Sequence, residues 1–135
     1  MKVVLDSNVL VAALATRGAC AELFSRVLAA HEYAVNDQIL AEVAKALSGK
    51  FRLQVDRVEA ALALLRSTAL VVVTTPLDVR VCRDPDDDGI LALVHAFSAR
   101  VLITGDEDLL VLHPWSGIPI VRPRDFWPID RAGGA

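Results

Sequence analysis

The sequence predicts an α/β domain of three layers, in which helices cover both faces of a central, mostly parallel five-stranded sheet. Two observations lead to this fold class. Short apolar runs, of the kind that form buried strands, alternate with longer segments whose apolar residues recur every three or four positions. The connections between the apolar runs are also too long for hairpins, so successive strands are expected to run parallel.

The chain begins with an expected strand followed by two helices. Residues 3–5 are a continuous apolar run, which suits a strand covered on both faces. Residues 9–15 are rich in alanine, leucine and valine and precede Gly18, a residue type that commonly ends helices. A second helix is expected through residues 23–28, because its apolar residues form a stripe along one side.

Two further strands and two further helices are expected in the middle of the chain. Residues 33–36 suit a short strand, and Asp37 is placed to cap a helix that runs to about Leu47. Residues 55–67 have the spacing of an amphipathic helix. The β-branched run over residues 70–73 predicts the third strand.

The remainder of the chain continues the alternation. An acid-rich segment, residues 83–89, leads into a helix expected over residues 88–98. Residues 101–103 suit the fourth strand, and residues 104–110 turn out of it into a short helix. Residues 118–121 give the fifth strand.

Length and composition suit one domain with its own core. The chain has 135 residues, of which 54% are hydrophobic, and it contains no repeat or linker. We expect the domain to span residues 1–127 and residues 128–135 to form a flexible tail. The apolar runs are too short to cross a membrane and no leader peptide is evident, so a cytoplasmic protein is expected. Cys20 and Cys82 stand far apart, which indicates neither a zinc site nor a disulfide framework.

Four acidic residues fall at related places in this expected topology. Asp6 follows the first strand, and Asp106 follows the fourth. Asp88 opens a helix, and Glu42 lies at the edge of the apolar face of another. Strand carboxyl ends and the amino ends of the following helices face the same side of a parallel sheet. We therefore expect these acids to converge in the crevice where α/β proteins bind ligands.

Helix capping is the alternative interpretation of these acids. Asp6 could cap the first helix, and Asp86 or Asp87 could cap the helix that follows the acid-rich segment. Thr104 and Glu107 have the spacing of a capping box, which would leave the acid between them in the first turn. Capping does not explain the glutamate inside a helix, although that residue could pair with a nearby lysine.

Converging carboxylates require a counter-charge. Two like charges about 4 Å apart repel by about 4 kcal/mol at an effective dielectric of about 20, whereas a whole domain is stable by only about 5 to 15 kcal/mol. A shared proton, a basic side chain or a divalent cation would relieve this repulsion. Oxygen ligands without histidine or cysteine favour Mg²⁺ or Mn²⁺, and a carboxylate-bound ion of this kind assists phosphodiester hydrolysis.

With these acids in view, the chain resembles the PIN-domain family, and in particular the VapC-type ribonuclease toxins of bacterial toxin-antitoxin operons. The resemblance covers nearly the whole chain. The matching segments are Val-Leu-Asp-Ser-Asn at 4–8, Ile-Leu-Ala-Glu-Val at 39–43, Asp-Pro-Asp-Asp-Asp at 84–88 leading into Ile-Leu-Ala, Thr-Gly-Asp-Glu-Asp-Leu-Leu at 104–110, and Ile-Pro-Ile-Val-Arg-Pro-Arg-Asp-Phe at 118–126.

The resemblance implies a PIN-like fold and an endonuclease that cuts single-stranded RNA with Mg²⁺ or Mn²⁺. It also implies a homodimer that a cognate antitoxin silences. Carried onto this sequence, it assigns both the metal and the catalytic role to Asp6, Glu42, Asp88 and Asp106. Glu42, or a hydroxide on the metal, would take the proton of the attacking water.

The same resemblance gives several neighbouring residues supporting roles. These are Ser7, Asn8 and Thr104, with Asp87 and Asp108 as further acids whose share is left open. Within the acidic run, Asp88 is chosen because the apolar residues of the helix follow it directly.

The contacts with RNA and the competing functions depend on weaker signals. Lys45, Lys50, Arg52 and Arg57 form a basic group that could guide RNA phosphates, or simply a solvated helix surface. Aromatic residues are few, so no base-stacking platform is evident. A PIN-like binding or assembly module without turnover is one competing function. An α/β phosphatase is another, disfavoured because the first strand ends in Asp-Ser-Asn rather than Asp-x-Asp.

Overall fold

The computed structural model describes residues 1–133 and has a five-stranded sheet at its centre, in which every neighbouring pair of strands is parallel. The order along the sheet is β3-β2-β1-β4-β5. The strands are β1 (Lys2–Leu5), β2 (Glu32–Val35), β3 (Leu70–Val71), β4 (Val101–Ile103) and β5 (Ile120–Val121). The predicted fold class is confirmed.

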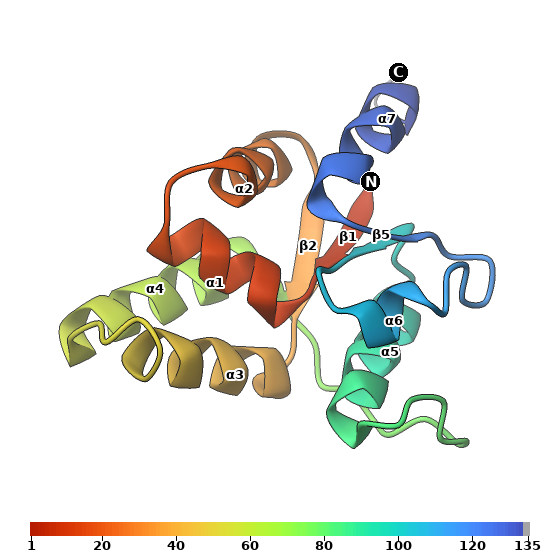
Figure 1. The fold of residues 1–135 in the computed structure, drawn as a ribbon, viewed down its shortest axis with the longest axis horizontal. Coiled ribbons are helices and arrows are strands. Elements are labelled where there is room, and N and C mark those ends of the chain that lie inside the picture. Colours follow the sequence, from red (N-terminus) through yellow and green to blue (C-terminus); the bar gives the residue numbers. More distant parts are fainter. Residues whose placement is uncertain (134–135) are drawn as a thin grey trace.

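Seven helices connect and cover the strands of the described chain. They are α1 (Ser7–Ala15), α2 (Ala19–Ala30), α3 (Asp37–Ser48), α4 (Val55–Thr68), α5 (Pro85–Phe97), α6 (Glu107–Leu110) and α7 (Pro123–Gly133). Figure 1 shows α1 to α4 on one side of the strands and α5 and α6 on the other. Right-handed crossovers explain this division, because the chain steps outward from β1 to β3 and then returns past β1 to β4 and β5.

This change of direction creates a crevice between β1 and β4. The chain leaves β1 toward one face of the sheet and leaves β4 toward the other, so the two connections diverge at the carboxyl ends of adjacent strands. Such a switch point is where open α/β sheets bind ligands. Asp6 and Thr104 are the first residues after these two strands.

Burial on both faces of the sheet explains the opening apolar run. Val3, Val4 and Leu5 are fully buried in β1, as expected for a central strand of a parallel sheet. On α3, Ile39 and Val43 repeat at the helical period and are also fully buried. None of the helices within residues 1–133 is long and apolar enough to cross a membrane.

The start of α5 differs from the prediction and matters for the site. This helix begins at Pro85 rather than near Asp88, because the Asp84 side chain accepts a hydrogen bond from the backbone N–H of Asp86 and caps it. Proline suits the first position of a helix, where its missing N–H costs nothing. The acids at 86–88 therefore lie inside the first turn, about 100° apart around the helix axis.

The flexible tail expected from Pro128 is corrected over residues 128–133, which belong to α7. Phe126 is fully buried. The Asp130 carboxylate accepts hydrogen bonds from Arg26 and also forms a hydrogen bond with the imidazole of His31. These contacts fix α7 against α2, and they outweigh the unfavourable proline within the helix. Residues 134 and 135 of the expected tail lie outside the described residues.

Candidate active site

Asp6 is the buried carboxylate at the end of β1. Its side chain is hydrogen-bonded by the backbone N–H of Ser7 at 2.7 Å, the hydroxyl of Thr104 at 2.7 Å and the amide of Asn8 at 3.3 Å. Burial raises its pKa, and the Asp106 charge acts in the same direction, although the hydrogen bonds oppose both. Asp6 is therefore held in one orientation in an environment that disfavours an isolated negative charge.

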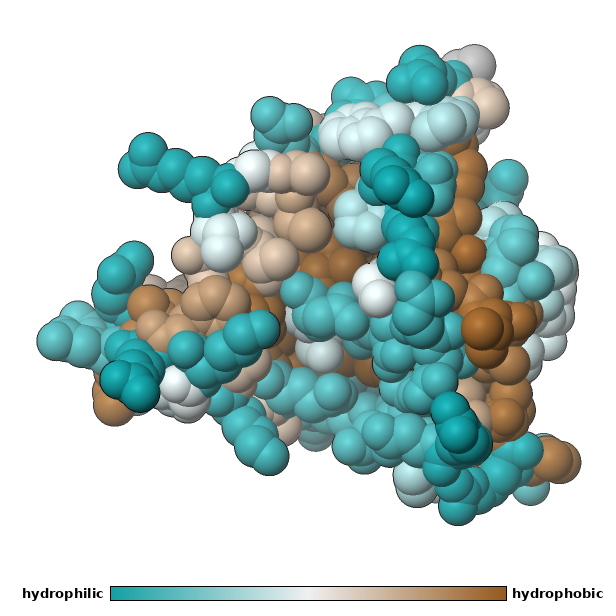
Figure 2. Space-filling view, viewed as in Figure 1, coloured by the Kyte–Doolittle hydropathy of each residue, from teal (hydrophilic) through white to brown (hydrophobic). Residues whose placement is uncertain are grey.

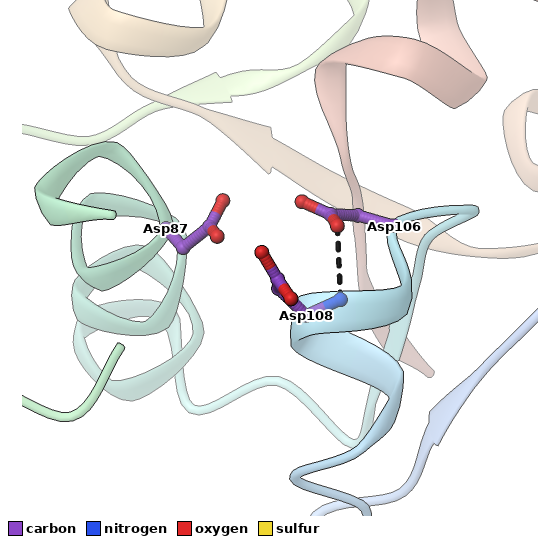
Figure 3. A group of neighbouring side chains, drawn as sticks. All are labelled: Asp87, Asp106 and Asp108. Atoms are coloured by element: carbon purple, nitrogen blue, oxygen red, sulfur yellow. Dashed lines mark hydrogen bonds between the residues drawn. The ribbon is translucent and has the colours of Figure 1, made fainter. Parts of the chain in front are cut away.

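Asp106 lies across the switch point from Asp6. The Thr104 hydroxyl that donates to Asp6 also accepts a hydrogen bond from the Asp106 backbone N–H at 3.0 Å. Asp106 in turn caps α6 by accepting from the N–H of Asp108 at 3.0 Å. The cap is thus Asp106 and not the Thr104–Glu107 capping box of the alternative interpretation, and it uses only one of the two carboxylate oxygens. The other is directed toward Asp87 (Figure 3).

Three carboxylates meet where α5 faces the turn into α6. One oxygen from each of Asp87, Asp106 and Asp108 lies within 4.8 Å of the others (Figure 3). Asp87 is buried, and burial together with the charges of Asp106, Asp84 and Asp6 raises its pKa to about 7. The pKa of Asp87 is therefore raised by the acids that follow β1 and β4, and also by Asp84, which caps its own helix.

Little positive charge within the protein offsets this cluster. In the part of the chain that the structure describes, the ion pairs involve Asp130, Asp88, Asp108 and Glu107 but none of Asp6, Glu42, Asp87 or Asp106. Asp108 pairs with Arg83, whose side chain is 90% exposed, so this pair lies in solvent at the rim. The donor set fits a hard divalent cation, because it consists of carboxylate oxygens only.

Glu42 faces the same site from α3. Its carboxylate accepts a hydrogen bond from the Ser7 hydroxyl at 3.3 Å and from the Gln38 amide at 3.0 Å. Partial burial raises its pKa, and the charges of Asp6 and Asp86 add to this effect against the hydrogen bonds. Gln38 also donates to the carbonyl of Asp86 at 2.6 Å, so it links Glu42 to the first turn of α5.

Asp88 is placed outside the acidic cluster. Its carboxylate accepts hydrogen bonds from the backbone N–H groups of Val81 and Cys82, at 3.1 and 2.8 Å, and lies 3.7 Å from the Arg80 guanidinium. Partial burial opposes ionisation of Asp88, but these contacts outweigh it and lower the pKa. The structure therefore brings Asp87, and not the expected Asp88, to the other acids.

Two of the four expected basic residues adjoin the site. Lys45 and Lys50 line a cavity of about 570 Å³ that extends from Ser7, Asn8 and Glu42 between α1 and α3. Arg52 and Arg57 do not line it. Hydrophilic residues cover the strip between α3 and α5 on this face of the molecule (Figure 2).

The family model of the PIN domain matches residues 2–108, a span that contains every acid of the site. This chain belongs to the PIN-domain family. PIN domains are generally nucleases that use divalent metals, and the carboxylates of this PIN domain fit that chemistry. No curated protein matches the sequence.

The architecture of this PIN domain is also found in a solved complex. VapBC2 from Rickettsia felis, bound to a DNA fragment from its promoter, matches with a TM-score of 0.62 and 13% sequence identity. The match covers 89% of this chain and 97% of the other. At this identity the likeness concerns the fold.

Two features of the site differ from the sequence prediction: Gln38 takes part in it, and Asp87 rather than Asp88 is the acid that α5 contributes to the cluster. The sequence does contain a signal for the start of α5, because aspartate is a typical N-cap residue and proline a typical first helical residue, and Asp84 stands directly before Pro85. A helix begun there turns Asp87 rather than Asp88 toward the site. Gln38 stands one turn before Glu42 on α3, but its bond to the Asp86 carbonyl joins distant segments and has no local signal.

Proposed function

We propose that this PIN domain is a metal-dependent endoribonuclease that hydrolyses phosphodiester bonds of single-stranded RNA. The observation that carries the proposal is the cluster of Asp87, Asp106 and Asp108 at the switch point of the sheet. The charges of Asp6 and Glu42 belong to the same site, because Asp6 acts on the pKa of Asp87 and of Glu42. No basic side chain pairs with Asp6, Glu42, Asp87 or Asp106 among residues 1–133. A site of this kind binds a cation and, through it, a phosphate.

Asp6, Asp87 and Asp106 are the residues that would hold Mg²⁺ or Mn²⁺, with Asp108 at the exposed rim. When bound, such an ion neutralises charge on the phosphoryl oxygens and lowers the pKa of water. The raised pKa of Asp87 supports the fit, because a bound cation would offset the burial and the neighbouring negative charges that raise it.

The remaining residues position the reactants. Glu42 is the general base in this proposal, since its pKa is raised and its oxygens face the site from a different element than the metal ligands. Gln38 holds Glu42 in that orientation from α3. Thr104, Ser7 and Asn8 fix Asp6, so little reorganisation is needed when substrate binds.

Cleavage of a labelled single-stranded RNA by the purified chain in Mg²⁺ tests the proposal. Asp6→Asn and Asp87→Asn are expected to lower the rate at least about 100-fold, a typical loss for a catalytic electrostatic group. Asp56→Asn removes an exposed acid from the first turn of α4 and serves as the matched control. Equal cleavage by the wild type and Asp6→Asn would identify a contaminating nuclease and refute the proposal.

We further propose that the protein acts in the cytoplasm as the toxin of a toxin-antitoxin pair, as a homodimer. Support comes from the sequence resemblance and from the fold shared with a VapBC complex. A small antitoxin gene is expected next to this reading frame, and its co-expression should relieve growth arrest caused by the wild-type chain. Growth arrest by Asp6→Asn equal to that of the wild type would contradict this role. Light scattering at the elution peak tests the dimer.

A further inference from the structure

A cavity between α1 and α3 adjoins the candidate active site. Its volume of about 570 Å³ falls within the range of small-molecule sites, about 300 to 1,000 Å³. One end is formed by Ser7, Asn8, Glu42 and Asp86, so it opens directly onto the carboxylates. The cavity then leads away from them along α3.

The opposite end of the cavity is basic. Lys45 follows Glu42 by three residues, which places the two side chains one turn apart on the same face of α3. Lys50 lies just beyond the end of that helix. Neither lysine forms an ion pair with an acid of the described chain, so both charges are available to an anion.

The wall between the acidic and basic ends is apolar. Val11, Ala12 and Ala46 contribute small side chains, which leave the space between the two helices hollow. Phe51 closes the basic end, with the Lys50 ammonium 5.6 Å from the centre of its ring. An aromatic ring with one cation beside it, and a second cation lining the same cavity, is a combination that suits base stacking and phosphate contact with a single-stranded nucleic acid.

We propose that this cavity binds the nucleotide adjacent to the scissile phosphate. The base of that nucleotide lies on the apolar wall against Phe51, and its phosphate is held by Lys45 and Lys50. The inference rests on the proposed function, because it takes the carboxylates as the place of cleavage. The unpaired lysines favour an anionic strand over a protein segment as the occupant.

Two features of this subsite determine what it recognises. Stacking accepts every base, so the subsite favours an unpaired, flexible strand and gives only a modest sequence preference. A duplex keeps its bases stacked on one another, and its nucleotides cannot enter a cavity between two helices. The subsite therefore explains a preference for single strands without contacts to base edges.

Fluorescence anisotropy with a labelled single-stranded RNA tests the subsite in the presence of EDTA, which prevents cleavage. The double variant K45A/K50A is expected to weaken binding and to lower the slope of log K against log salt by about 1.4, or about 0.7 for each lysine. Arg66→Gln, in the exposed last turn of α4, removes one charge elsewhere and should leave the slope unchanged. A slope that is the same in all three proteins overturns the proposal.

Phe51→Leu tests the stacking part of the proposal with little change in apolar volume. Loss of one stacked base is expected to weaken RNA binding at least about 5-fold. Circular dichroism shows whether each variant keeps its fold, and the lysine variants change only surface residues. Unchanged RNA affinity in a folded Phe51→Leu protein would show that no base stacks on Phe51 and would overturn the stacking part of the proposal.

Cleavage kinetics in Mg²⁺ separate this inference from the proposed function. If the wild type cuts RNA, K45A/K50A should raise KM while kcat stays within a few-fold, because the lysines bind the strand away from the reacting atoms. Unchanged KM together with active wild type overturns the subsite and leaves the nuclease intact. An inactive wild type that still shows the lysine-dependent salt slope overturns the nuclease and shows that the cavity binds RNA without cleavage.

Discussion

The hydroxyl of Thr104 donates a 2.7 Å hydrogen bond to the carboxylate of Asp6 and thereby joins the carboxyl ends of β4 and β1. The same hydroxyl accepts the backbone N–H of Asp106 at 3.0 Å. Thr104 is fully buried, so no water replaces it. One side chain thus sets the separation of two acids that come from distant parts of the sequence.

Replacement of this hydroxyl should destabilise the protein and disorder the site. Thr104→Val keeps the shape but removes one of the three hydrogen bonds to the Asp6 carboxylate and leaves the Asp106 N–H without its partner. A loss of about 1–3 kcal/mol in the free energy of unfolding is expected. Urea denaturation measures it, with Thr16→Val on the exposed end of α1 as the control. Equal stability of the Thr104→Val and wild-type proteins would contradict the role of the bond.

Metal-free stability should depend on pH through Asp87. Its pKa is about 7 in the folded chain, against about 3.9 in an unfolded one, so the folded state binds more protons between these values. The Asp87 contribution to stability therefore falls as pH rises from about 4 to 7. Asp87→Asn removes this loss, and its melting temperature should exceed that of the wild type by more at pH 8 than at pH 5. Thermal unfolding in EDTA measures both differences, and an identical difference at the two pH values would contradict the raised pKa.

Gly89 is required because Gln38 occupies the space beside it. A Cβ built on Gly89 would lie 1.8 Å from the Gln38 side-chain oxygen. Gly89→Ala should therefore displace Gln38, release Glu42 and lower RNA cleavage, even though alanine is the better helix former by about 1 kcal/mol. In a Gln38→Ala background the clash is absent, so the same substitution should stabilise the protein. A double-mutant cycle in the free energy of unfolding tests whether Gly89→Ala destabilises the wild type and stabilises the Gln38→Ala protein. Destabilisation in both backgrounds would contradict it.

The C-terminal helix should contribute to stability rather than act as a tail. Burial opposes ionisation of Asp130, but the contacts with His31 and Arg26 outweigh it and lower the pKa. Its contribution is therefore present above the pKa of an unfolded aspartate, about 4, and is lost as pH falls through the lower folded value. Asp130→Asn should cost about 1.5–3 kcal/mol at pH 7, as for other hydrogen bonds to charged groups. Asp125→Asn, exposed on the same helix, is the control. Equal unfolding curves for the two variants would contradict this role.

Local patterns were enough to predict the fold class and most elements. The apolar run of β1 and the apolar stripe of α3 are visible in the sequence, and both sets of side chains are buried in the structure. The positions of Asp6 and Asp106 after β1 and β4 also follow from the order of strands, because adjacent parallel strands end at the same edge.

The remaining features depend on contacts that the sequence does not reveal. The apolar residues that follow Asp88 favour it as the ligand, but α5 begins at Pro85, and this start directs Asp87 rather than Asp88 toward the other acids. The helix α7 was missed because Pro128 argues against a helix. The bonds from Arg26 to Asp130 that help to fix it join residues 104 positions apart.

Titration of Mn²⁺ by isothermal calorimetry into the metal-free chain and two neighbouring variants decides which acid of α5 belongs to the metal site. Asp87→Asn should weaken Mn²⁺ binding at least about tenfold, since it removes a ligand from the carboxylate cluster. Asp88→Asn should stay within about twofold of the wild type, because that side chain holds the loop at Val81 and Cys82. Loss of binding in Asp88→Asn with wild-type affinity in Asp87→Asn would show that Asp88, and not Asp87, is the ligand.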